Sequence, residues 1–104
     1  MTEFELINRF FAPDAGRGRV TSGPAPVLGI GDDCALLMPP ASGCLLAIST
    51  DMLIEGRHVV AGTAAAAIGH KTLAVNLSDL AAMGAEPLGF TLALAVPDVR
   101  AEWL

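Results

Sequence analysis

The chain has 104 residues, of which 53% are hydrophobic and 16% are charged, and its formal net charge is -5. This length suits one domain with a modest core and is too short for two. The acidic balance and the lack of any Lys/Arg cluster argue against nucleic acid or an anionic membrane as the main partner.

No secretory signal is predicted, because no basic stretch followed by an apolar run opens the chain. The longest uncharged run, residues 34–50, contains two prolines and a glycine and does not fit a membrane span. Cys34 and Cys44 lack metal-ligand spacing and lie in apolar runs. They are interpreted as reduced core residues of a cytoplasmic protein rather than as a disulfide.

The mean hydropathy of +0.57 is high for a small monomer. It fits either strands buried on both faces, or an apolar surface that another subunit or missing chain covers. Residues 97–104 have the pattern of a helix that is just beginning, with Asp98 as its N-cap. We therefore interpret the chain as a fragment of a longer protein.

The N-terminal residues predict a short helix. Thr2 and Glu5 fit a capping box, and Phe4, Ile7 and Phe11 form an apolar stripe. Residues 12–26 contain three prolines and three glycines and predict a flexible loop, whose two arginines, Arg17 and Arg19, are interpreted as solvated charges rather than phosphate ligands.

Short strands are predicted at 27–30 and 34–38, on either side of Gly31-Asp32-Asp33. A turn at 39–43 leads to a longer strand at 44–50, whose continuous apolar run suggests burial on both faces. Asp51 follows directly, at a strand end where ligand-binding side chains often gather.

Residues 52–60 are expected to be irregular. Thr63 then caps a helix that runs through Met83 and is stopped by Gly84. On a helical wheel Thr72, Asn76 and Asp79 share one polar stripe on an otherwise apolar helix. Another strand is predicted at 88–96. The expected fold class is α/β (α+β), with a mixed or mainly antiparallel sheet backed by helices.

Three acidic points emerge from apolar elements at Asp33, Asp51 and Asp79. Taken singly, each fits a turn, a cap or a solvated helix residue. Side by side they would repel one another unless cations lay between them. Mg²⁺ prefers such oxygen ligands, and Ser49 and Thr50 would add further oxygens. The pattern predicts a multi-metal clamp for a nucleotide phosphate chain, without a P-loop or protein-kinase signature.

Three segments carry a family resemblance: Gly-Ile-Gly-Asp-Asp-Cys-Ala-Leu at 29–36, Ser-Thr-Asp-Met-Leu-Ile-Glu-Gly-Arg-His at 49–58, and Lys-Thr-Leu-Ala-Val-Asn-Leu-Ser-Asp-Leu-Ala-Ala-Met-Gly-Ala at 71–85. In this order and spacing they closely resemble the N-terminal part of the bacterial thiamine-monophosphate kinase family. That family belongs to the aminoimidazole ribonucleotide synthetase-like superfamily. The resemblance covers almost the whole chain and implies an N-terminal ATP- and Mg²⁺-binding domain over residues 1–104.

The resemblance implies ATP-dependent phosphorylation of thiamine monophosphate to thiamine diphosphate by direct in-line transfer. Several Mg²⁺ ions would be held, and the implied ligands are Asp33, Ser49, Thr50, Asp51 and Asp79. His58 would contact the substrate. No catalytic base is assigned, because the attacking phosphate, with a second pKa of about 6, is largely deprotonated at neutral pH. Asp32 is expected to bind metal through water or to orient its loop, and Arg57 and Lys71 receive no role.

Members of this family are longer and form homodimers, and they contain a downstream Gly-Gly-Asp segment and a C-terminal domain that the present chain lacks. The chain alone is therefore expected to be inactive. Two alternatives stay open: a non-catalytic module that binds divalent cations or phosphate, and another ATP-using enzyme of the same superfamily. A reading frame that continues beyond Leu104 into Gly-Gly-Asp favours the kinase, whereas a stop codon there favours the module.

Overall fold

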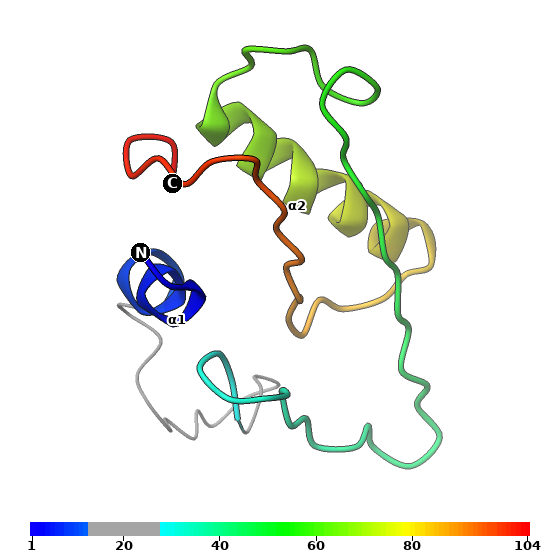
Figure 1. Cartoon of the computed structure of the whole chain (residues 1–104). Helices are drawn as coiled ribbons and strands as arrows, with labels where there is room; N and C mark the ends of the chain where they lie inside the picture. The colour runs from blue at the N-terminus through cyan, green and yellow to red at the C-terminus, as the bar shows by residue number, and fades with distance from the viewer. Residues whose placement is uncertain (13–27) are drawn as a thin grey trace. The chain divides into compact units, whose positions relative to one another are not determined.

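The structure is a computed structural model that describes residues 1–12 and 28–104 (Figure 1). The chain divides into two compact units. One comprises Met1–Cys44 with Leu88–Val99, and the other Leu45–Pro87 with Arg100–Leu104. The predicted loop at 12–26, with Arg17 and Arg19, lies outside the described residues from position 13 onward, as does Val27.

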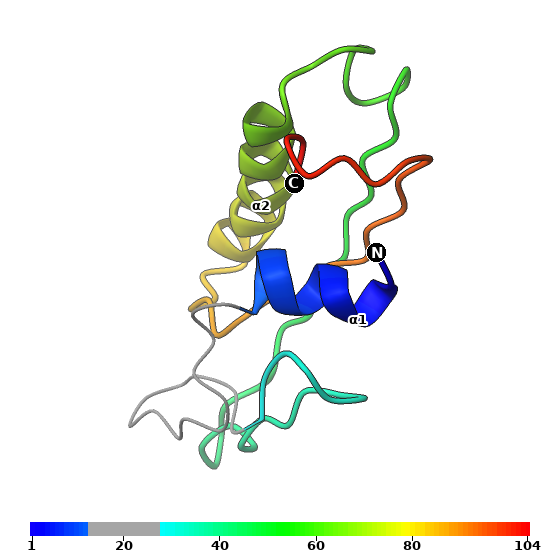
Figure 2. The ribbon, with the colours of Figure 1, turned by 60° about the vertical axis from the view of Figure 1, so that its left-hand side comes forward.

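The N-terminal helix is confirmed. Helix α1 spans Glu3–Leu6 and continues as the π-helix η1, Ile7–Phe11, so that the two form one continuous helical segment (Figure 2). Thr2 and Glu5 make the predicted capping box: the Thr2 amide donates to Glu5 Oε2 at 2.7 Å, and the Glu5 amide donates to Thr2 Oγ1 at 3.3 Å. Both bonds satisfy amides that the first turn of a helix leaves unpaired.

Leu28 and Leu36 form an isolated antiparallel bridge, with backbone N–O distances of 3.3 and 3.0 Å. The connecting turn contains Gly31 at φ 107°, a backbone conformation that residues with a side chain rarely adopt. The two short strands predicted here are therefore reduced to one bridged pair of residues. Their acidic turn projects Asp32 and Asp33 into solvent.

Helix α2 spans Ala65–Ala82, close to the predicted range. The prediction that Thr63 is its N-cap is wrong: Ala64 holds that position without a side-chain bond, and the Thr63 hydroxyl donates to the Val60 carbonyl at 2.6 Å. At the other end Gly84, at φ 65°, stops the helix as predicted. The amides of Gly84 and Ala85 return to the carbonyls of Ala81 and Leu80 at 3.0 and 2.9 Å, which is a Schellman motif.

The predicted sheet stays a prediction. Within the described ranges the β structure consists of two isolated bridges, Leu28–Leu36 and Glu55–Val59, and residues 44–50 and 88–96 form no ladder. The expected burial of 44–50 on both faces is wrong for this structure, because Leu45 is 96% and Ile48 82% exposed. Apolar strand faces are buried only against further strands or helices. In the described chain this segment bonds α2 through the Ser49 side chain alone and pairs with no strand.

No described residue is buried, so the two units lack a closed core. Cys34 and Cys44 are free thiols, as expected, but both are exposed, and their assignment to a core is wrong here. Near the end of the chain, the amides of Trp103 and Leu104 bond the Arg100 carbonyl at 3.0 and 3.2 Å. These bonds make a single turn and not the helix expected after Asp98. No helix in the described part of the chain is long and apolar enough to cross a membrane.

Candidate functional site

Two of the predicted metal ligands meet in the Leu45–Pro87 unit. The Ser49 hydroxyl donates to Asp79 Oδ2 at 3.0 Å. Ser49 lies near the end of the apolar segment at 44–50, and Asp79 lies in the C-terminal half of α2. The two residues are 30 positions apart, so the contact joins two separate segments. The hydroxyl and the carboxylate are both exposed, which leaves their remaining oxygen lone pairs open to a ligand.

The other two members of the polar stripe on α2 bond their own helix. The Thr72 hydroxyl donates to the Ile68 carbonyl at 2.7 Å, and Asn76 Nδ2 donates to the Thr72 carbonyl at 2.9 Å. Both bonds are partly buried and run one turn back along α2. Of the stripe, Asp79 is therefore the member whose side chain hydrogen-bonds another segment.

Thr50 and Asp51 follow Ser49 directly and are exposed. This stretch runs as an open, extended chain in Figure 1. Alternate side chains of an extended chain share a face, so we expect Asp51 on the face of Ser49 and Thr50 on the other. Within the unit, Asp51 is therefore the second carboxylate that the segment can direct toward the side of Asp79.

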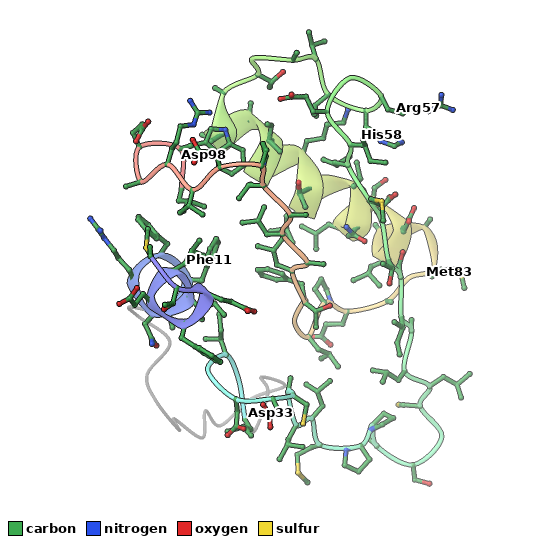
Figure 3. All side chains as sticks on the ribbon, viewed as in Figure 1. Phe11, Asp33, Arg57, His58, Met83 and Asp98 are labelled. Carbon is green, nitrogen blue, oxygen red and sulfur yellow. The ribbon has the colours of Figure 1, made fainter. Side chains whose placement is uncertain are left out.

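Asp33 belongs to the other unit, so the structure describes it separately from the remaining predicted ligands. Its amide donates to Asp32 Oδ1 at 2.9 Å. This bond uses one Asp32 oxygen to hold the turn, while the Asp33 carboxylate stays exposed on the loop (Figure 3). The bond agrees with a loop-orienting role for Asp32, and the assignment of Asp33 as a metal ligand stays a prediction.

The donors have the chemistry that a hard cation requires, since carboxylates and hydroxyls are the ligands of Mg²⁺. Over residues 1–12 and 28–104, however, no group of three or more His, Cys, Asp or Glu side chains is arranged to hold a metal ion. The Ser49–Asp79 pair is the part of the predicted constellation that the structure assembles.

His58 lies on a tight loop at residues 54–59 (Figure 3). The Ile54 amide donates to His58 Nδ1 at 3.0 Å, and the His58 amide donates back to the Ile54 carbonyl at 2.9 Å. Gly56, at φ 82°, allows the turn, and its amide donates to the Val59 carbonyl at 2.7 Å. Because Nδ1 accepts a bond, a neutral imidazole here carries its proton on Nε2 and presents a donor to any ligand.

Lys71 reaches this loop from α2. Its Nζ donates to the His58 backbone carbonyl at 2.5 Å. Lys71 has no role predicted from the sequence, because no local sequence pattern indicates this contact. The two residues are 13 positions apart on different elements, and their contact depends on the path of the intervening chain.

Residues 31–104 match the family described as AIR synthase related protein, N-terminal domain. The chain belongs to this family. The matched region contains every residue predicted above to bind metal or substrate.

Among curated relatives, the thiamine-monophosphate kinase of Escherichia coli (strain K12) is 53% identical over 103 residues, which cover 98% of this chain and 30% of the relative. That of Salmonella typhimurium is 52% identical with the same coverage. That of Synechococcus elongatus is 59% identical over 76 residues, 71% of this chain and 23% of the relative. The chain thus spans less than a third of the length of these relatives. No solved structure matches.

Proposed function

We propose that the full-length protein transfers a phosphoryl group from ATP to thiamine monophosphate and so forms thiamine diphosphate. The observation that carries this proposal is the 53% identity over 103 residues to a relative named thiamine-monophosphate kinase. The geometry agrees with it, because the hydrogen bond between Ser49 and Asp79 brings together two oxygen donors of the kind that accompany phosphate chemistry.

The acceptor is itself a phosphate, which is largely ionised at neutral pH because its second pKa is about 6. The attacking oxygen therefore needs no strong general base, and the protein's task is to align the two phosphates and offset their repulsion. The exposed oxygens of Ser49 and Asp79 suit this task, and no acid or base among the described residues is buried.

Asp33, Ser49, Thr50, Asp51 and Asp79 would hold several Mg²⁺ ions. When bound, these ions supply charge neutralisation and positioning of the phosphates. His58 would contact thiamine monophosphate through its Nε2–H, a donor that suits an acceptor atom of the substrate.

We further propose a cytoplasmic homodimer without nucleic-acid or membrane partners. The exposed apolar residues of the 44–50 and 88–96 segments support association, because a soluble protein seldom leaves so much apolar surface uncovered. The net charge of -5 supports the absence of polyanionic partners.

The test uses the purified full-length protein with ATP, Mg²⁺ and thiamine monophosphate, and thiamine diphosphate is measured by chromatography. Asp51→Asn and Asp79→Asn should each lower kcat by at least about 100-fold at saturating Mg²⁺, because each removes a carboxylate charge from the phosphate site. Glu102→Gln removes an equal charge outside the set and serves as the control. Near-normal turnover in either Asp variant removes that residue from the proposed metal site.

The same assay separates the alternatives. An unmodified full-length protein that binds Mg²⁺ and ATP but forms no product would favour a non-catalytic module. Turnover with another acid or phosphate in place of thiamine monophosphate would favour a different ATP-using member of the AIR synthase related family, which the match over 31–104 also accommodates.

A further inference from the structure

The loop that carries His58 is closed by bonds of its own backbone and is fastened to α2 by one side chain. Inside the loop, Ile54 holds both the amide and the imidazole of His58, at 2.9 and 3.0 Å. From outside, Lys71 Nζ bonds the His58 carbonyl. A charged donor makes a stronger hydrogen bond to a carbonyl than a neutral donor does.

We propose that Lys71 is a positioning residue for thiamine monophosphate, which acts by holding the His58 loop against α2. The inference rests on the proposed function for its substrate and on the contact of Lys71 with His58 for its geometry. The Lys71 ammonium group donates to a backbone carbonyl of the protein. This positioning role differs from direct contact with a substrate phosphate.

The same bonds also determine which hydrogen-bond donor His58 presents to a ligand. While the Ile54 amide donates to Nδ1, the imidazole is held in one orientation and keeps Nε2–H as its free donor. Fastening the His58 carbonyl to α2 limits the positions that this donor can take. Release of the carbonyl should loosen the substrate contact and leave the in-line transfer itself unchanged.

The test is Lys71→Met in the full-length protein, because Met keeps the length of the side chain and removes the donor. We expect KM for thiamine monophosphate to rise about 3- to 10-fold, the range for losing one intramolecular hydrogen bond. We expect kcat and KM for ATP to stay within about twofold. Hydrogen exchange of residues 54–59, measured without substrates, should accelerate. Lys71→Arg retains a donor and should recover most of both effects.

The matched control is Arg57→Met, which removes a positive charge from the same loop. The Arg57 side chain extends away from the loop in Figure 3, and its backbone amide keeps its bond to the Ile54 carbonyl at 3.1 Å after the substitution. We expect Arg57→Met to leave KM and loop exchange unchanged. A rise in KM equal to that of Lys71→Met would show a charge effect and overturn the proposal.

A double variant decides whether Lys71 acts through His58. In a His58→Ala background, Lys71→Met should raise KM no further, because the contact that it positions is already gone. An additive rise would overturn the proposal, as would a rise in KM for ATP, which would mark direct phosphate contact. Absence of turnover in the unsubstituted protein would refute the proposed function alone. In that case loop exchange still decides whether Lys71 holds the loop.

Discussion

Asp79 is distinguished from its neighbours on α2 by the direction of its bond. Thr72 and Asn76 return their side-chain donors to helix carbonyls, whereas the Asp79 carboxylate accepts a bond from Ser49 on another segment. A carboxylate has no donor to give a helix carbonyl when ionised, so its remaining oxygen capacity stays available. The helical spacing of the sequence predicted the stripe, but it did not separate the residue open to a ligand from the two that bond their own helix.

The ionisation of Glu5 makes the stability of the N-terminal capping box depend on pH. The Thr2 backbone amide, and then the Thr2 side chain, hydrogen-bond Glu5 and lower the pKa of its carboxyl below the ordinary value. A lowered pKa in the folded state favours folding above the unfolded-state pKa. That contribution is lost as pH falls through the folded-state value. The first turn of α1 should therefore loosen in acid.

Glu5→Gln keeps a side-chain acceptor but cannot titrate, so it should remove this pH dependence. The measurement is the ratio of hydrogen exchange rates of the first turn in the unsubstituted protein and in Glu5→Gln, at each pH. The ratio should stay constant near neutral pH and rise below the ordinary pKa of a glutamate. A constant ratio throughout the acid range would contradict the assignment.

At the scale of elements, local chemistry predicted the helices well. The capping box, Gly84 and the apolar periodicity gave α1 and α2 nearly their observed extents. The start of α2 was missed because the Thr63 hydroxyl bonds Val60 in the preceding turn, a choice that depends on the loop and not on α2. Strands depend less on local chemistry. An extended segment becomes a strand only through partners distant in sequence, and the described residues provide single bridges.

Gly84 closes α2 with its left-handed backbone, at φ 65°. Gly84→Ala should lower the free energy of unfolding of the full-length protein by about 1 kcal/mol, because a Cβ is strained in this conformation. No heavy atom lies within 4 Å of the position of that Cβ, so the cost comes from the backbone and not from a clash. The measurement is chemical denaturation.

The control is Gly84→Asn, since asparagine tolerates the left-handed region better than alanine does. It should recover part of the lost stability even though its side chain is larger. An Asn variant less stable than the Ala variant would indicate crowding around Gly84 in the full-length protein, and would contradict the backbone explanation.

For the whole molecule, two parts of the candidate site differ in how far they follow from the sequence. The Ser49–Asp79 contact joins two residues that the pattern of polar clusters had already placed in one site. The contact of Lys71 with His58 had no such signal, because it depends on the tertiary path of the loop. Asp33 lies in the other compact unit, so its association with Asp51 and Asp79 stays a prediction that rests on the family resemblance.

The apolar segments 44–50 and 88–96 lead to the last prediction. Leu45 is 96% and Phe90 72% exposed, and neither segment belongs to a ladder in the described structure. Extended apolar chain is stable in water only when its backbone and side chains are covered. We expect the rest of the full-length protein, or a second copy, to supply the missing strands. Amides of both segments should then exchange at least about tenfold more slowly in the full-length protein than in the 104-residue chain.

Amide exchange at several protein concentrations distinguishes strands of the same polypeptide from strands of a second copy. Strands supplied by the same polypeptide protect these amides at every protein concentration, whereas strands supplied by a second copy protect them less as the dimer dissociates. The loop at residues 54–59 is the internal reference, because its bonds are made within the chain and to α2. Equal exchange of segments 44–50 and 88–96 in the two proteins would contradict the predicted sheet. It would also leave the exposed apolar residues without the structural role that their pattern indicates.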